Sequence, residues 1–183
     1  MSRGVGELRL IQDFLPEWSA LALAVVTQLG DLWLVAILFA ALYWRREGLR
    51  REILGLAVAV VVGAAAFVSL KSVFALPRPD SPLLAAEEVP ALVRPLYTAT
   101  AFSDGYGFPS GHATVSTVVY FGLASILTLW DRHRQYVVAG TIVAVVSFTR
   151  LALGLHYLVD VLAGVALGGA VLVTTRALLA RVD

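Results

Sequence analysis

The chain alternates long apolar runs with short polar connections. A helix needs about 20 mostly apolar residues to cross the hydrocarbon core of a bilayer, and about 17–25 are tolerated. Residues 31–44 are somewhat short, but Gly30–Asp31 predicts a helix start and Tyr43–Trp44 forms an interfacial aromatic pair. We therefore count this run as a span together with four longer runs, which cover residues 53–70, 111–129, 136–153 and 157–175. The pattern predicts five membrane-spanning helices.

The first 30 residues form a weaker apolar segment. Residues 15–29 are apolar but short, and they carry Pro16, Glu17 and Trp18. A run of this length is typical of an interfacial or re-entrant segment rather than a full span. We expect residues 1–30 to form an N-terminal interfacial or re-entrant helix ahead of five spans, with six spans as the alternative.

Composition agrees with a membrane protein. Hydrophobic residues make up 59% of the 183 residues, compared with about 45–50% in soluble domains even when glycine is counted. A soluble domain of this size could not bury so much apolar surface. The formal net charge of +1 gives no basic surface for nucleic acid. The sequence predicts an all-α, polytopic helical bundle, a single domain over residues 1–183 that crosses the cell membrane several times.

The basic residues indicate the orientation. With five spans, eight arginines lie at one end of the bundle: Arg45, Arg46, Arg50, Arg51, Arg132, Arg134, Arg176 and Arg181. The positive-inside rule assigns that end to the cytoplasm. Arg3 and Arg9 favour the six-span alternative, because five spans place them outside, whereas the short first run favours five. The long connection at residues 77–109 then lies outside, where its length predicts a loop or lid with a function.

Three separate stretches place polar residues at the predicted non-cytoplasmic ends of spans. They are residues 71–79 (KSVFALPRP), 107–116 (GFPSGHATVS) and 149–160 (TRLALGLHYLVD). The alternating directions of the spans bring all three to one face of the membrane. Because ionisable groups at membrane depth are costly and usually functional, this convergence predicts a single site.

The cations and the helix start in these stretches suit a phosphoryl group. Lys71, Arg78 and Arg150 supply three positive charges, and the planar guanidinium group binds phosphate in a bidentate manner. Ser110 and the backbone N–H of Gly111 lie at a predicted helix N-terminus, which is a natural phosphate cradle. Such an arrangement stabilises the negative charge that builds up during phosphoryl transfer.

Two histidines can divide the remaining chemistry. A neutral imidazole that is oriented by a carboxylate can attack phosphorus, and His156 with Asp160 at i,i+4 fits this role. His112 could protonate the leaving oxygen and later activate water. No carboxylate cluster suited to Mg²⁺ is visible in the sequence, so this scheme needs no metal ion and no other cofactor.

The pattern Lys-x6-Arg-Pro, Pro-Ser-Gly-His and Arg-x5-His-x3-Asp resembles the type 2 phosphatidic acid phosphatase superfamily, which shares its phosphate pocket with the vanadium-dependent haloperoxidases. The likeness covers residues 53–175 approximately. It implies metal-independent dephosphorylation with His156 as nucleophile, oriented by Asp160, and His112 as acid. It also implies that five residues bind the substrate phosphate: Lys71, Arg78, Ser110, Gly111 and Arg150.

We therefore expect a lipid phosphatase with its active site on the non-cytoplasmic face and a phosphohistidine intermediate. The pattern leaves the lipid open: phosphatidate, phosphatidylglycerophosphate and polyprenyl pyrophosphate all fit, so both monoesters and pyrophosphates are candidates. A lipid phosphotransferase would use the same pocket and pass the phosphoryl group to an alcohol. A membrane transporter would use the buried charges as an ion path, and the two motif histidines count against it.

Four other positions have a structural interpretation. Gly154 lets the chain turn between two spans. Gly164 and Gly168 form a small-xxx-small pair, which predicts close helix packing. Asp31 is interpreted as a helix cap.

Overall fold

The computed structural model describes residues 4, 6–79, 81–101 and 105–181, and Arg3 lies outside this described part. The described residues form helices and no strand. In chain order the α-helices, with short 3₁₀ helices η1 to η3 between them, are α1 (Glu7–Asp13), α2 (Ser19–Val26), η1 (Thr27–Gly30), α3 (Leu32–Arg45), η2 (Glu47–Leu49), α4 (Arg50–Phe74), η3 (Ala86–Glu88), α5 (Arg94–Ala101), α6 (Gly111–Ile126), α7 (Arg132–Ala152) and α8 (Leu158–Leu179).

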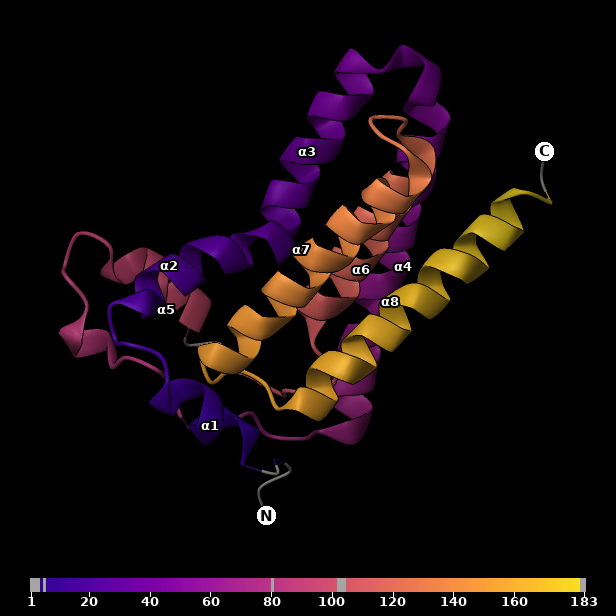
Figure 1. Cartoon of the computed structure of the whole chain (residues 1–183). Helices are drawn as coiled ribbons and strands as arrows, with labels where there is room; N and C mark the ends of the chain where they lie inside the picture. Colours follow the sequence, from indigo (N-terminus) through magenta and orange to yellow (C-terminus); the bar gives the residue numbers. More distant parts are fainter. Residues whose placement is uncertain (1–3, 5, 80, 102–104, 182–183) are drawn as a thin grey trace.

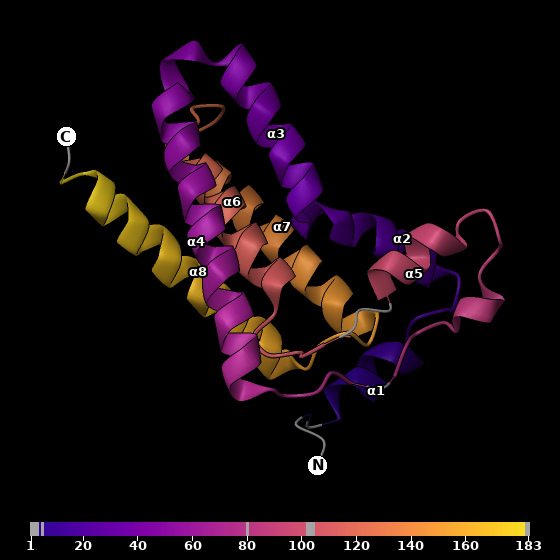
Figure 2. The ribbon, with the colours of Figure 1, turned by 180° about the vertical axis from the view of Figure 1, so that it is seen from behind.

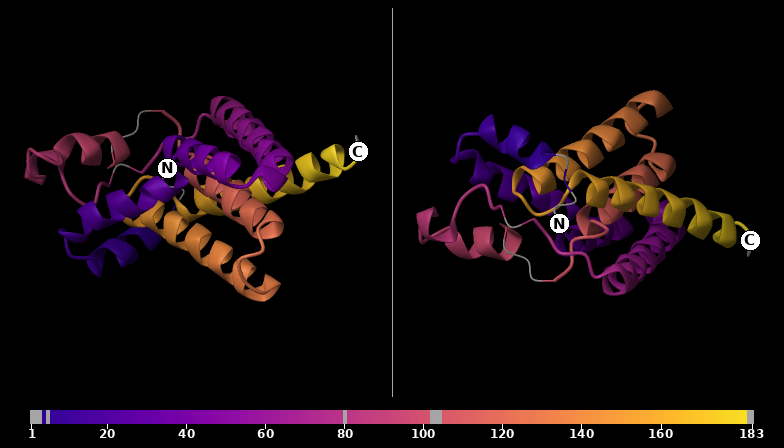
Figure 3. Two further views of the ribbon diagram at one scale, coloured as in Figure 1. Left: turned by 90° about the horizontal axis from the view of Figure 1, so that it is seen from above. Right: turned by 90° about the horizontal axis from the view of Figure 1, so that it is seen from below.

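The longer helices run between two ends of the molecule in alternating directions (Figures 1 and 2). The connections at 46–49 and 127–131 and the C-terminal end of α8 lie at one end, whereas α1, α5 and the residues just before α6 and α8 lie at the other (Figure 1). Arg9, in α1, is therefore at the opposite end from the basic connections. Seen along the bundle, α1, α2 and α5 lie to one side, away from the C-terminal end of α8 (Figure 3).

Several helices have the length and hydropathy of membrane spans. Three qualify singly, namely Glu47–Phe74, Arg132–Ala152 and Leu158–Leu179. A fourth candidate is the pair Ser19–Gly30 and Leu32–Arg45, which is bent by 51° at Asp31. The sixth helix, α6, has 16 residues, fewer than the roughly 20 that cross a bilayer core unaided. The all-helical membrane fold is thus confirmed with three or four candidate spans, and the count of five stays a prediction.

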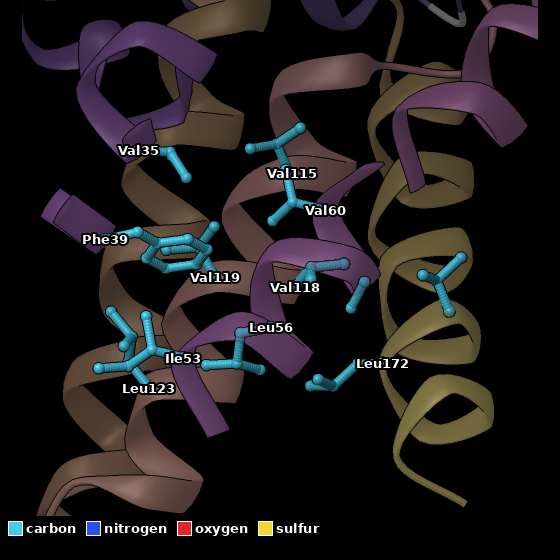
Figure 4. Packing of buried hydrophobic residues seen from close by; sticks show 12 residues of the cluster. Val35, Phe39, Ile53, Leu56, Val60, Val115, Val118, Val119, Leu123 and Leu172 are labelled. Carbon is cyan, nitrogen blue, oxygen red and sulfur yellow. The ribbon is translucent and has the colours of Figure 1, made fainter. Parts of the chain in front are cut away.

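α6 is the central helix, because it packs against α4, α7 and α8. Its apolar side chains meet those of α3, α4 and α8 in the main core cluster (Figure 4). Figure 4 labels these buried residues from four helices: Val35, Phe39, Ile53, Leu56, Val60, Val115, Val118, Val119, Leu123 and Leu172. Lipid tails are as apolar as these side chains, so their contribution is tight van der Waals packing rather than removal from water.

Two glycines let α8 approach the backbone of α6 closely, as predicted. A Cβ atom on Gly164 would lie 2.5 Å from the carbonyl oxygen of Ser110, and one on Gly168 would lie 2.6 Å from that of Thr114. Both distances are far below van der Waals contact. The N-terminal turn of α6, which carries the Pro-Ser-Gly-His motif, is therefore held directly against the start of α8.

Hydrogen bonds of Gln12 join α1 to the chain after α4 and to the end of α7. Nε2 of Gln12 donates to the carbonyl oxygens of Ser81 at 2.9 Å and Ala152 at 3.2 Å, and Oγ of Ser81 donates to Oε1 of Gln12 at 3.0 Å. Gly154 has a φ of +72°, so the predicted turn between the last two helices is confirmed. The chain after Arg78 and the chain before His156 are thus fastened to each other through α1.

The connection at residues 77–109 contains the short helices η3 and α5. Its residues Leu84, Val89 and Tyr97 pack against α2 and against Leu153 and Leu155 in a second apolar cluster. The hydroxyl of Tyr97 donates to the carbonyl oxygen of Leu84 at 2.9 Å, and burial raises the pKa of this phenol. This connection therefore braces the short N-terminal helix α2 against the link between α7 and α8.

Candidate active site

A cavity of about 230 Å³ lies where the three predicted motif stretches meet. Its walls are formed by the break between η1 and α3, the C-terminal ends of α4 and α7, the start of α6 and the links that carry Arg78 and His156. The lining residues are Gly30, Asp31, Leu32, Phe67, Lys71, Arg78, Gly111, His112, Val115, Arg150 and His156. Six of the eight predicted site residues line this cavity, so the structure brings the motifs together as expected.

The two arginines of the cavity are held by neutral acceptors. Arg150 is 2% exposed, and its Nη1 donates to Oγ1 of Thr27 at 3.2 Å. Nη1 of Arg78 donates to the carbonyl oxygen of Leu155 at 3.1 Å. The buried Nε groups of both arginines have no hydrogen-bond partner within the described part of the chain. Because an unsatisfied buried donor costs about 1–3 kcal/mol, these N–H groups favour an anion in the cavity.

Lys71 is the third cation of the cavity, and burial affects the charges of the cations there. Nζ of Lys71 donates to the carbonyl oxygen of Tyr106, which ties the end of α4 to the chain before α6. Burial lowers the pKa of Arg78, and the negative charge of Asp160 opposes that shift. Three cations of like sign that are partly removed from water repel one another, so a bound phosphate would relieve their repulsion.

The geometry around His156 specifies one tautomer of its ring. Nε2 lies 3.1 Å from Nη1 of Arg78, and a guanidinium group can only donate, so Nε2 must carry the lone pair. Nδ1 therefore bears the proton and faces Oδ2 of Asp160 at 3.5 Å. Burial lowers the pKa of His156 to about 3; the Asp160 contact raises it, and the nearby cations lower it further. The imidazole is thus neutral at physiological pH, and its lone-pair nitrogen faces the guanidinium group of Arg78.

Asp160 lies behind His156 rather than in the cavity, and it connects two elements. Its Oδ2 accepts from the backbone N–H of Tyr157 at 3.0 Å, and its carbonyl oxygen accepts from the N–H of Ser110 at 2.9 Å. The sequence predicts the His156–Asp160 contact from helical spacing. In the structure His156 precedes α8 in a non-helical link, and Asp160 reaches back to it from the first turn of the helix.

The N-terminus of α6 divides its residues between structure and cavity. Ser110 is fully buried, and its Oγ accepts from the N–H of Ala113 at 3.5 Å, a weak helix cap. Gly111 and His112 line the cavity, and a Cβ atom on Gly111 would lie 3.1 Å from the ring of Phe67. Binding of phosphate by the Ser110 side chain therefore stays a prediction, because this residue is not among those that line the cavity.

The family model described as the PAP2 superfamily matches residues 52–182 and so includes all three motif stretches. This chain belongs to the PAP2 superfamily. The resemblance that the motifs indicate is thereby confirmed. The match begins after α3, so the N-terminal segment that closes one side of the cavity lies outside it.

Three relatives are lipid phosphatases by name. Phosphatidylglycerophosphatase B of Bacillus subtilis is 35% identical over 82 residues, which cover 42% of this chain and 40% of that protein. Human sphingosine-1-phosphate phosphatase 2 is 33% identical over 110 residues, 57% of this chain and 24% of the relative. Lipid A 4′-phosphatase of Bacteroides thetaiotaomicron is 46% identical over 66 residues, 36% and 28% of the respective chains. The matched region spans less than half the length of each of these relatives.

Two solved PAP2-type structures share the fold. The transmembrane PAP2 type phosphatidylglycerolphosphate phosphatase from Bacillus subtilis has a TM-score of 0.75 at 22% identity, covering 97% of this chain and 85% of that one. Aquifex aeolicus LpxE has a TM-score of 0.74 at 20% identity, covering 97% and 96%. At such identities the likeness shows a common helical membrane fold.

Sequence reasoning missed two polar contacts that this PAP2 chain adds from its N-terminal segment. Thr27 accepts from Arg150, and Oδ1 of Asp31 lies 3.1 Å from Nε2 of His112. Asp31 occupies the N-cap position of α3, as its interpretation as a helix cap expects, but its carboxylate makes no capping hydrogen bond. The available signal was a carboxylate at a helix break at membrane depth, a place where ionisable groups are usually functional.

The donor set of the cavity suits an anion. Among the described residues no three His, Cys, Asp or Glu side chains are grouped so that they could hold a metal ion. The cavity instead combines three cations, a helix N-terminus and two imidazoles. In chemical terms this set can hold a phosphoryl group, attack it with a neutral nitrogen and exchange a proton beside it.

Proposed function

We propose that this protein is a lipid phosphatase that hydrolyses a phosphate monoester or pyrophosphate of a membrane lipid through a phosphohistidine intermediate. The observation that carries the proposal is the environment of His156. Its lone-pair nitrogen lies 3.1 Å from Arg78 in a cavity that Lys71 and Arg150 also line, and its other nitrogen faces Asp160. Family membership and the names of the relatives support the same activity.

In the first step, Nε2 of His156 attacks phosphorus while the bond from phosphorus to the lipid oxygen breaks. The cations neutralise charge on the non-bridging oxygens, which is where it builds up in phosphoryl transfer. His112, in its imidazolium form, gives a proton to the departing lipid oxygen. The positive charge that develops on the phosphorylated imidazole is balanced by Asp160 at Nδ1.

In the second step, water replaces His156 on phosphorus. The now neutral His112 takes a proton from the attacking water, the phosphorus–nitrogen bond breaks, and inorganic phosphate leaves. Both imidazoles return to their starting states when the product departs. The scheme uses each histidine in two roles, as nucleophile and leaving group or as acid and base.

The apolar part of the cavity wall indicates how a lipid reaches the site. Leu32, Phe67 and Val115 line the cavity beside the cations, and Leu32 at the start of α3 is 48% exposed on the outer surface of the helices. We propose that the acyl or prenyl tail enters sideways along this wall while the phosphate meets the cations. The eight arginines at the opposite end of the bundle support a site at the external leaflet under the positive-inside rule.

The test is release of inorganic phosphate from a panel of lipids by the detergent-solubilised protein, with and without a chelator. The panel contains phosphatidate, phosphatidylglycerophosphate, sphingosine 1-phosphate, a lipid A phosphate and polyprenyl pyrophosphate. We expect release from at least one lipid, unchanged by chelator. Chelator-sensitive release would contradict the metal-free scheme, and transfer to an added alcohol would identify a phosphotransferase instead.

Variants of the two histidines separate their roles. His156→Ala should abolish both turnover and the trapped phosphoenzyme, because no other group then attacks phosphorus. His112→Ala should slow turnover of lipids by about 10²–10⁴-fold, the usual contribution of general acid–base catalysis, yet still allow phosphorylation by a substrate with a good leaving group. Wild-type turnover by His156→Ala would overturn the mechanism.

A further inference from the structure

The break between η1 and α3 is fastened to the catalytic helices on several sides. The carbonyl oxygen of Leu29 accepts from the hydroxyl of Tyr120 at 2.8 Å, and Thr27 accepts from Arg150 at 3.2 Å. Gly30 packs so closely that a Cβ atom there would lie 2.9 Å from Cγ1 of Val146 and 3.1 Å from Cδ2 of His112. The break is therefore part of the cavity wall, at a fixed distance from the ring of His112.

Asp31, at this break, is one of the residues that line the cavity. Its Oδ1 lies 3.1 Å from Nε2 of His112, close enough for an ion pair, although the two groups are not aligned as an ideal hydrogen bond. The side chains are 29% and 21% exposed, so the pair is shielded from much of the solvent. Because the carboxylate makes no capping hydrogen bond to α3, starting this helix does not account for it.

The positive charges around His112 explain why a carboxylate is needed beside it. Arg150 from α7 and Arg78 from the link after α4 line the same cavity as the ring, and their positive charges oppose a positive charge on it. Asp31 from the start of α3 is the carboxylate that lines this cavity, and a negative charge 3.1 Å from the ring favours the imidazolium. An acid that must hold a proton beside two arginines needs such a counter-charge.

We propose that Asp31 is the positioning residue of His112: it fixes the proton on Nε2, leaves Nδ1 to exchange a proton with the lipid oxygen and with water, and stabilises the imidazolium that protonates the leaving group. This inference rests on the proposed phosphatase function. It gives the site two carboxylate–imidazole pairs with different tasks. Asp160 orients the neutral ring of the nucleophile His156, whereas Asp31 stabilises the positive charge of His112 before its proton passes to the lipid oxygen.

The test compares Asp31→Asn with Glu17→Gln, a matched loss of an exposed carboxylate on the same N-terminal segment. Asp31→Asn should lower kcat for the best lipid substrate by about 10–100-fold, the range seen when the partner that orients a functional histidine is removed from metal sites, with KM within about threefold. First-turnover release of p-nitrophenol from p-nitrophenyl phosphate should change by less than about threefold, because that leaving group needs no proton. Glu17→Gln should match the wild type.

A pH profile supplies a readout that a purely structural role would not move. The alkaline limb of kcat reports loss of the proton from His112, and without the nearby negative charge this limb should move to lower pH by about one unit. Asp31→Glu, which keeps the carboxylate, should return most of the shift. When His112→Asn is already present, adding Asp31→Asn should lower kcat by less than about a further twofold, because both residues act in the same step.

The outcomes distinguish this inference from the proposed function. A wild-type protein that releases no phosphate, or His156→Ala at full activity, would overturn the phosphatase proposal itself. If the wild type is active, two results would overturn the role of Asp31 alone. One is a pH profile of kcat that Asp31→Asn leaves unchanged, and the other is a loss of kcat from Asp31→Asn that adds in full to the loss from His112→Asn. If Asp31→Asn does not fold, Asp31→Ser, which also removes the negative charge, takes its place: we expect the alkaline limb displaced to lower pH, and a wild-type limb contradicts the proposal.

Discussion

At the residue scale, the neutral state of His156 makes the stability of the protein depend on pH. An unfolded histidine binds a proton below about pH 6.5, whereas burial lowers the pKa of the folded His156 to about 3. The unfolded chain therefore binds more protons between these values, and the free energy of unfolding must fall as pH falls through this window. Above about pH 6.5 the contribution of this group is fully present.

The prediction is a difference in pH sensitivity between the wild type and His156→Gln. Between pH 7 and pH 5 the wild type should lose about 2 kcal/mol more of its free energy of unfolding than the variant, from linkage at this one residue. Denaturation in detergent at the two pH values measures it. Because His112 and His133 are the same in both proteins, equal losses would show that the folded His156 binds a proton as readily as the unfolded chain.

The residues of the site that could be predicted from sequence are those with a diagnostic spacing. Lys71 and Arg78, or His156 and Asp160, form short local patterns whose chemistry is visible without coordinates. Asp31 could not be assigned in this way, because its partner His112 lies 81 positions later and the contact depends on how a broken helix packs. A lone Asp after Gly fits a helix cap equally well, and only the direction of the side chain separates the two interpretations.

At the scale of elements, the positions of the helices were predictable and their ends were not. The apolar run at 53–70 continues as helix to Phe74, because Lys71 and its neighbours are compatible with a further turn beyond the apolar part. The run at 111–129 stops being helical at Ile126. There the side chain of Gln135 binds the N–H of Leu129 at 2.8 Å and the carbonyl oxygen of Ala124 at 3.1 Å, a long-range cap that hydropathy does not encode.

Glycines on α8 provide a test of how helix packing controls the site. Gly164→Ala would place a Cβ atom 2.5 Å from the carbonyl oxygen of Ser110, so α8 and the first turn of α6 must separate. Overpacking of this kind costs typically about 1–3 kcal/mol, and the shift should also lower kcat because the same turn carries His112. Thermal denaturation in detergent and phosphate release measure the two effects.

The control for that substitution lies on the same helix. Gly169 has no atom within 4 Å of the position that a Cβ would take, so Gly169→Ala should leave activity unchanged and stabilise the helix by up to about 1 kcal/mol. If both alanine variants behave alike, close contact between α8 and α6 does not position the active site.

At the scale of the whole molecule, convergence of the motifs follows from chain direction. The helices alternate between two ends, and the ends of α4 and α7 meet the starts of α6 and α8 at the end that also carries α1 (Figure 1). The eight arginines named in the sequence analysis lie at the other end. The sequence could predict this separation, because hydropathy locates the spans and the positive-inside rule orients them without any knowledge of how the helices pack. The bend of 51° before α3 could not be predicted in this way, because it depends on packing against α6 and α7.

The side of the membrane that the site faces can be tested with single cysteines, since the chain has none of its own. Glu87, in the connection before α5, and His133, at the start of α7, are both exposed and lie at opposite ends of the bundle. Gln135, two positions after His133, is buried, so a cysteine there would be a poor labelling site. In intact cells an impermeant maleimide should label Glu87→Cys, whereas His133→Cys should react only after the membrane is opened, because arginine-rich connections stay in the cytoplasm. The reverse pattern would place the cavity on the cytoplasmic side and exclude lipids of the external leaflet as its substrates.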